Sequence, residues 1–129
     1  MNQWAAAGAV ALGGALGSVL RYAVGTWFFQ RVGPGFPWGT LTINVTGSFV
    51  IGVVLTLVQS RAGLSPAVRL FLATGVLGGY TTFSAFAYET LQLARDANAA
   101  QSVAYALGSV VAGVAAALLG VVLTRAVSP

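Results

Sequence analysis

The sequence contains no cysteine, no histidine and no lysine, and its only acidic residues are Glu89 and Asp96. These absences exclude disulfides, catalytic triads built on histidine, and zinc sites built on histidine or cysteine. A phosphate-binding P-loop is also excluded, because that motif requires a lysine. The two acids stand seven residues apart, one in an apolar run and one in a connector, and make a poor general acid and base pair. The inventory therefore predicts that the chain is not an enzyme.

Charge is scarce as well. Only 6% of the 129 residues are charged and 57% are apolar, whereas a soluble domain carries roughly 25% charged residues. The only basic residues are six arginines, too few for a basic patch, so we expect no nucleic-acid partner. The length is that of one domain, residues 1–129. We predict an all-α integral membrane protein whose solvent is the lipid bilayer.

A membrane-spanning helix needs roughly 20 apolar residues. Four segments meet this requirement: Trp4–Phe29, Trp38–Gln59, Pro66–Ala94 and Ala99–Thr124. The connectors are short, and the GPGFP run in the first of them is typical of a turn. The first apolar run is too long for a signal peptide and no positive segment precedes it, so we expect it to be a span.

The arginines give no orientation to this bundle. Four spans place both termini on one side of the membrane, and each side carries three arginines if Arg21 snorkels outward. The positive-inside rule therefore makes no assignment. Two interpretations stay open: the loops are too short to show a bias, or the chain inserts both ways and pairs as an antiparallel, dual-topology homodimer. The arginines are Arg61, Arg69 and Arg125 on one side, and Arg21, Arg31 and Arg95 on the other.

Small residues recur at intervals of four on two spans, which lets helices approach closely in lipid. Packing within one chain and packing between two chains explain any single stripe equally well. All the stripes together favour an oligomer, because a small bundle has little interior. The stripes are Ala9, Gly13 and Gly17 on the first span, and Gly108 with Ala112 and Gly113 with Ala117 on the fourth.

Polar residues also line single faces of apolar helices. Thr40, Asn44 and Ser48 recur at fours on the second span, and Tyr105 and Ser109 lie one turn apart on the fourth. A side-chain amide inside a membrane is rare unless it pairs with another group or lines water. Asn44 therefore either bonds a neighbouring helix or donates to something that passes.

The third span contains the run GVLGGYTTFSAFAYET, residues 75–90. Its glycine pair, Gly78 and Gly79, predicts a helix that unwinds in mid-span and frees backbone carbonyls and amides. Freed carbonyls suit a small cation, and freed amides suit an anion. Phe83 and Phe86 follow on one face. They are either core packing or a pair of electropositive ring edges that line an anion path.

Three runs together resemble the signature segments of the Fluc (CrcB) fluoride channel family: GALGSVLRY, WGTLTINVTGSFVIG and GVLGGYTTFSAFAYET. The resemblance covers essentially the whole chain. It implies an antiparallel, dual-topology homodimer in the cell (inner) membrane with two pores, through which fluoride leaves the cytoplasm passively. It also implies a third helix that is broken mid-span and a structural sodium ion at the dimer centre.

The resemblance assigns roles to individual residues. It implies a fluoride pore formed by Asn44, Phe83, Phe86, Ser109 and Tyr105, to which the polar face of the second span adds Thr40. The carbonyls of Gly78 and Thr81 would hold the sodium ion, with Arg21 and Glu89 in the vestibule or nearby. Some members carry a further serine one turn after Ser109, where this chain has Gly113, so its polar track is thinner.

Two other functions stay open. A small proton-coupled multidrug exporter can also be a four-span dual-topology dimer, but it needs a buried carboxylate, usually on the first span. The first span here has no acid, and Glu89 lies on the third. A non-transporting assembly subunit is the other alternative, and the polar faces argue against it. Fluoride efflux without a proton gradient would separate channel from exporter.

Overall fold

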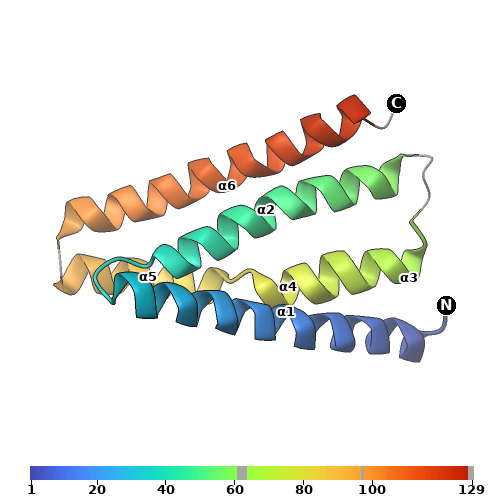
Figure 1. Ribbon diagram of the computed structural model, residues 1–129, viewed down its shortest axis with the longest axis horizontal. Coiled ribbons are helices and arrows are strands. Elements are labelled where there is room, and N and C mark those ends of the chain that lie inside the picture. Colours follow the sequence, from blue (N-terminus) through green and yellow to red (C-terminus); the bar gives the residue numbers. More distant parts are fainter. Residues whose placement is uncertain (61–63, 97, 128–129) are drawn as a thin grey trace.

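The chain forms a bundle of long helices in the computed structural model, which describes residues 1–60, 64–96 and 98–127. Four stretches in this part of the chain are long and apolar enough to cross a membrane: Gln3–Val32, Trp38–Gln59, Pro66–Asp96 and Ala99–Val127. The predicted four-span, all-helical architecture is therefore confirmed, with ends shifted by up to three residues. Both described ends of the chain lie at the same end of the bundle (Figure 1). Arg61 falls outside the described residues.

Several helix ends coincide with residues that cap them. Helix α1 (Gln3–Val32) begins where Asn2 accepts a hydrogen bond from the Ala5 amide, and it ends at Gly33, whose φ of 82° favours glycine. The turn leads into α2 (Trp38–Gln59). At the start of the third span, Ser65 caps the helix and Pro66 occupies its first turn. Helix α6 (Ala99–Val127) ends the described chain.

The third span consists of four consecutive segments. They are α3 (Pro66–Arg69), the π-helix η1 (Leu70–Leu77), α4 (Gly78–Tyr80) and α5 (Phe83–Asp96). Thr81 and Thr82 lie in no helix, and Thr81 is extended, with φ −78° and ψ 158°. Gly78, by contrast, has ordinary right-handed helical angles. The prediction that the chain unwinds at the glycine pair is therefore wrong in position, because the non-helical residues are the two threonines.

Glycines set the distances between neighbouring helices. A Cβ added at Gly13 or Gly17 would collide with backbone carbonyls of η1, and one added at Gly79 would collide with α1. The stripe predicted on the first span therefore packs within the chain. On α6, Gly120 makes an equally close approach to α2, whereas Gly108 has no neighbour within 4 Å among the described residues. The sequence stripe at Gly108 thus marks an open face.

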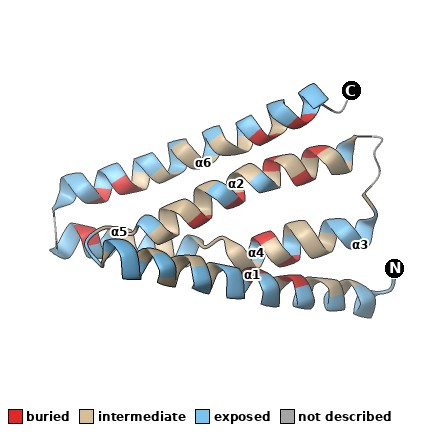
Figure 2. Ribbon diagram, in the orientation of Figure 1, coloured by how far each residue is buried: buried red, intermediate tan, exposed pale blue. Residues whose placement is uncertain are grey.

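The interior of the bundle is small. Its buried apolar side chains are few, and large apolar side chains cover the outside of every long helix (Figure 2). Helix α2 packs mainly against α6, and α1 packs mainly against η1 and α4. Exposed apolar side chains of this kind are typical of a protein in a bilayer, because lipid tails solvate them. The buried apolar residues are Ile43, Val54, Leu77, Leu93 and Tyr105.

Candidate functional site

The two non-helical threonines are held by a side chain from α2. Asn44 donates from Nδ2 to the Thr82 carbonyl at 2.9 Å, and its Oδ1 accepts from the Thr82 amide at 2.8 Å. One asparagine thus satisfies both polar groups of a residue that has left the helix. The amide nitrogen carries a second hydrogen, for which no acceptor is present among the described residues. Asn44 therefore has a structural bond and a spare donor.

The hydroxyls around this interruption are mostly engaged locally. Thr82 Oγ1 accepts from the Ala85 amide at 3.3 Å, and so acts as the N-cap of α5. Thr81 Oγ1 donates back to the Leu77 carbonyl at 2.8 Å. The Thr81 carbonyl, in turn, accepts from Arg21 Nη1 at 3.4 Å. Arg21 therefore points into the bundle at the interruption, rather than out of the span.

A carboxylate links three helices at one end of the bundle. Glu89, on α5, accepts from Thr40 Oγ1 of α2 at 2.7 Å, and from the Tyr105 hydroxyl of α6 at 2.7 Å. Each hydroxyl has one hydrogen, so neither donates to another group in this arrangement. Thr40 and Tyr105 were predicted as donors along an anion path. The structure engages both with Glu89, a pairing that their separation in sequence does not reveal.

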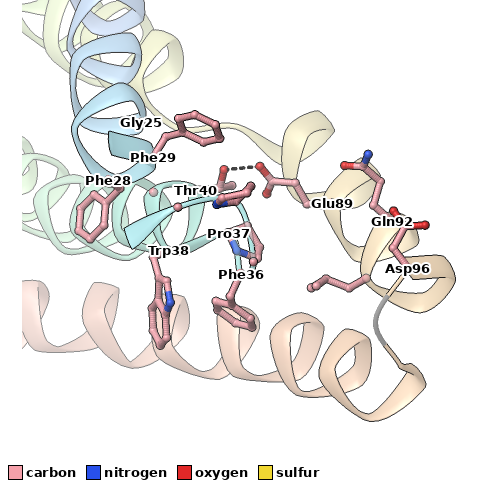
Figure 3. Close-up of a pocket in the computed structure, with 15 residues that line it drawn as sticks. Gly25, Phe28, Phe29, Phe36, Pro37, Trp38, Thr40, Glu89, Gln92 and Asp96 are labelled. Carbon is pink, nitrogen blue, oxygen red and sulfur yellow. Dashed lines mark hydrogen bonds between the residues drawn. The ribbon is translucent and has the colours of Figure 1, made fainter. Parts of the chain in front are cut away.

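The Glu89 cluster borders a hollow of about 610 Å³ between the end of α1, the turn before α2 and the end of α5. In Figure 3, Thr40 and Glu89 point toward one another, and Gln92 and Asp96 follow on the same helix as Glu89. Both acids of the chain line this hollow. Aromatic side chains from the turn supply much of the remaining wall.

Aromatic rings form a continuous row from the interruption to this end. The ring centroids of Phe83 and Phe86 are 5.6 Å apart, and Phe86 and Tyr105 are 5.3 Å apart. The row continues to Phe36, edge-on to Tyr105 at 5.4 Å. Tyr105 is only 1% exposed, whereas Phe83 is 79% exposed in the single chain. Phe83 therefore starts the row at the surface of the single chain, and Tyr105 is its most buried member.

A second hollow, of about 520 Å³, brings most of the predicted pore residues together. Asn44, Phe83, Phe86 and Ser109 all line it, beside Gly78, Thr81 and Gly113. Ser109 is distinctive here, because its hydroxyl oxygen is buried and has no hydrogen-bond partner among the described residues. Ser48, also on the predicted polar face, donates back to the Asn44 carbonyl at 2.7 Å. Asn44 and Ser109 are thus the members with free hydrogen-bonding capacity.

Two site features escaped the sequence reasoning. The role of Thr82 as the partner of Asn44 was not predicted, although a threonine pair beside a glycine pair was a signal of a capped interruption. Ser102 was also missed. It is buried and donates to the Thr90 carbonyl at 2.7 Å, which ties α6 to α5 across their connector. No motif marks such a bond, because serine commonly lies in membrane helices.

Comparison with known proteins places the whole bundle in one family. Residues 8–121 match the family described as CrcB-like protein, Camphor Resistance (CrcB). A protein named fluoride-specific ion channel FluC from Rhizobium meliloti is 52% identical over 117 residues, which cover 91% of this chain and 94% of that one.

Relatives with the same name occur in distant bacteria. The Thermus thermophilus protein is 52% identical over 111 residues, covering 86% of this chain and 87% of its own. The Nitrobacter winogradskyi protein is 49% identical over 125 residues, covering 97% of this chain and 99% of its own. The matches extend over all four long helices, including the interruption and the Glu89 cluster. The chain is therefore a multi-pass membrane protein of the CrcB family.

Proposed function

We propose that this chain is a passive fluoride channel that lets fluoride leave the cytoplasm and so relieves its toxicity. The observation that carries the proposal is the second hollow, which brings Asn44, Phe83, Phe86 and Ser109 together in one chain. The family supports it, because the relatives compared above are named fluoride-specific ion channels. Those names also agree with the prediction that the chain is not an enzyme.

The chemistry of the hollow suits a small, strongly hydrated anion. Such an ion needs hydrogen-bond donors in place of water, and Asn44 offers its second amide hydrogen. Ser109 offers a hydroxyl that is otherwise unpartnered. The edges of the Phe83 and Phe86 rings are electropositive and repel no anion. No lysine is present to trap fluoride, so these weak donors permit passage.

Beyond Phe86, the proposed path reaches Tyr105 and Thr40. Both hydroxyls donate to Glu89 in this structure. For either to donate to fluoride, it must rotate away from the carboxylate. We therefore place Glu89 beside the path, where it either gates the path or supports its wall. Arg21 attracts anions toward the inner end of the path.

A structural sodium ion is part of the proposal, and the residues present fit it. In a continuous helix, the Gly78 carbonyl would accept from Thr82 and the Thr81 carbonyl from Ala85. Those two amides donate to side chains instead. Both carbonyls therefore keep lone pairs for a hard cation, which prefers oxygen ligands. When bound, the ion would join the interrupted third helices of two chains.

The dimer and its dual topology belong to the proposal as well. The described chain exposes large apolar side chains on every long helix, and Phe83 is among them. A second chain would cover part of this surface and complete the wall opposite the hollow. The arginines divide nearly equally between the two sides, three against two without Arg21, and so leave little bias in insertion, as an antiparallel pair requires.

The exporter alternative has less support from the structure. Proton coupling needs a carboxylate that alternates between proton and substrate. Both oxygens of Glu89 already accept from Thr40 and Tyr105. The remaining acid, Asp96, lies at the exposed end of α5. Neither offers a free carboxylate to a substrate chamber in the middle of the bundle.

Fluoride efflux from liposomes tests the proposal. Purified protein is reconstituted into vesicles loaded with potassium fluoride, and efflux is followed with a fluoride electrode after valinomycin is added. We expect efflux that needs no proton gradient and does not occur with chloride. Efflux that appears only when a proton gradient is imposed would favour the exporter, and protein that releases both anions equally would contradict fluoride selectivity.

A further inference from the structure

Two side chains hold the amides that would otherwise close the third helix. We propose that Asn44 and Thr82 are positioning residues of the cation site, because their hydrogen bonds keep the carbonyls of Gly78 and Thr81 available to the ion. This inference rests on the proposed function, in which those two carbonyls bind sodium. It gives Asn44 a second role, distinct from donation to fluoride.

Two backbone amides at the interruption donate to side chains instead of to the carbonyls four residues earlier. In an α-helix, the amide of each residue donates to the carbonyl four residues earlier. The amide that would donate to the Gly78 carbonyl is that of Thr82, which donates to Asn44 Oδ1 instead, at 2.8 Å. The amide that would donate to the Thr81 carbonyl is that of Ala85, which donates to Thr82 Oγ1 instead, at 3.3 Å. Each carbonyl thus loses its partner to a side chain of this chain.

Asn44 also prevents the Thr82 peptide group from rejoining the helix. Its Nδ2 donates to the Thr82 carbonyl at 2.9 Å, so the amide group grips both polar atoms of that residue. In lipid, a backbone group that leaves a helix needs such a replacement partner. A leucine of similar size would offer none. The Thr82 amide would then return to the Gly78 carbonyl, and the helix would continue across the interruption.

A cation is the partner that these carbonyls lack. The nearest donor to the Thr81 carbonyl is Arg21 Nη1, at 3.4 Å, which is long for a hydrogen bond. That contact leaves room for a closer ligand on the same oxygen, which has two lone pairs. Arg21 has no hydrogen bond to the Gly78 carbonyl among the described residues, whereas a small ion would contact both carbonyls. The site is therefore completed by an ion rather than by the chain.

Sodium-dependent stability tests the inference, using the full chain purified in detergent. Sodium is titrated against choline, and the concentration that gives half of the maximal rise in unfolding temperature is measured. Two variants remove the side-chain acceptors, Asn44→Leu and Thr82→Val, and a matched control, Thr82→Ser, keeps the hydroxyl acceptor. We expect the first pair to need at least tenfold more sodium, and the control to stay within twofold of wild type.

Fluoride efflux on the same preparations separates the two roles of Asn44. Asn44→Asp keeps the acceptor for the Thr82 amide but loses the donor to the Thr82 carbonyl. We expect it to lose efflux and to need more sodium than the wild type but less than Asn44→Leu. Folded Asn44→Leu and Thr82→Val with wild-type sodium responses would overturn the inference. If they do not fold, hydrogen exchange of the wild type decides. Sodium should slow exchange at the amides of Thr82 and Ala85, and unchanged rates would overturn the inference.

The control for the underlying proposal is the wild type itself. A wild-type protein whose stability ignores sodium would overturn the inference. Normal fluoride efflux from that protein would show that the channel proposal stands without the ion. A wild-type protein with a normal sodium response but no fluoride efflux would show that the cation site exists in a protein that is not a fluoride channel.

Discussion

Asn44 joins the interrupted third span to the hollow where an anion would pass. Its bonds to Thr82 fix the side chain in one orientation, and that orientation leaves the second amide hydrogen for the hollow. The donor is therefore preorganised, and an ion that meets it needs no rearrangement of the protein. A single substitution that changes the charge and keeps the shape tests this arrangement.

Asn44→Asp is expected to stop fluoride efflux at neutral pH. Two like charges a few ångströms apart repel by about 4 kcal/mol at an effective dielectric constant near 20. Protonation removes the charge, so any residual efflux should grow as pH falls. Efflux is measured between pH 5 and pH 7 on protein that elutes as intact dimer. Normal efflux at neutral pH would remove Asn44 from the path.

Phe83→Ile and Phe86→Ile should slow fluoride efflux, because each removes an electropositive ring edge and keeps an apolar wall. Their costs in stability should differ. Phe83 is largely exposed, whereas Phe86 packs against Tyr105. Efflux and the unfolding temperature are measured together, and Phe86→Ile should lower the unfolding temperature more than Phe83→Ile. Unaltered efflux in both folded variants would show that the rings are only packing.

At this scale the sequence predicted residues that the fold brings together, but it did not predict their hydrogen-bond partners. Asn44, Phe83, Phe86 and Ser109 were predicted from helical spacing and family resemblance, and all line one hollow. Glu89, however, was not expected to accept from hydroxyls on two other spans. Such pairs depend on the rotation of each helix about its axis. A nearly uniform apolar helix leaves that rotation undetermined in the sequence.

At the scale of elements, glycine determines how close the first and third spans lie. A Cβ at Gly17 would meet the Val76 carbonyl and the Tyr80 amide, which are backbone atoms and cannot move aside cheaply. Gly8 lies on the same helix, and a Cβ there meets nothing within 4 Å among the described residues. The two glycines therefore provide a matched pair.

Gly17→Ala should lower the free energy of unfolding by ~1–3 kcal/mol, as overpacking of a fitted interface does. Gly8→Ala should change it little. Thermal unfolding in detergent measures both variants beside the wild type. Equal losses in the two variants would show that the close approach of α1 to η1 at Gly17 does not decide stability.

The Glu89 cluster couples three elements at the other end of the bundle. Tyr105→Phe removes one of its two hydrogen bonds and nothing else, so it should cost ~1–3 kcal/mol of stability. Tyr88→Phe, on the exposed side of α5, is the control and should cost almost nothing. Chemical or thermal unfolding compares the two. A Tyr105→Phe variant as stable as the control would mean that the bond to Glu89 contributes nothing net.

The elements themselves were largely predictable. Long apolar runs, capping residues and the GPGFP turn located the four spans to within three residues. The predicted position of the interruption was wrong, because the glycine pair was expected to break the helix. Gly79 instead permits contact with α1, and the threonines leave the helix since Asn44 and Thr82 Oγ1 replace its hydrogen bonds.

At the scale of the whole molecule, the described chain leaves its hollow open on one side. Phe83 is mostly exposed, a Cβ added at Gly108 would meet nothing within 4 Å among the described residues, and α6 shows a row of large apolar side chains. Lipid can cover such a face, but lipid cannot supply the second set of carbonyls that a central cation would need. A second copy in the opposite orientation would supply them by symmetry. The nearly equal division of arginines, three against two without Arg21, would permit such insertion.

Dual topology is testable on the wild-type chain. A carboxyl-terminal tag should report both sides of the membrane in comparable amounts, because the arginines divide three against two when Arg21, which lies within the bundle, is left out, and this leaves little bias. Two or three lysines added beside Arg61 would bias the chain toward one orientation. Antiparallel partners would then become scarce, so fluoride efflux per unit of protein should fall several-fold. Coexpression with a copy biased the other way, by lysines beside Arg95, should restore it. A wild-type chain whose tags all report one side would rule out the antiparallel dimer, and full efflux from the biased chain alone would show that the pore needs no inverted partner.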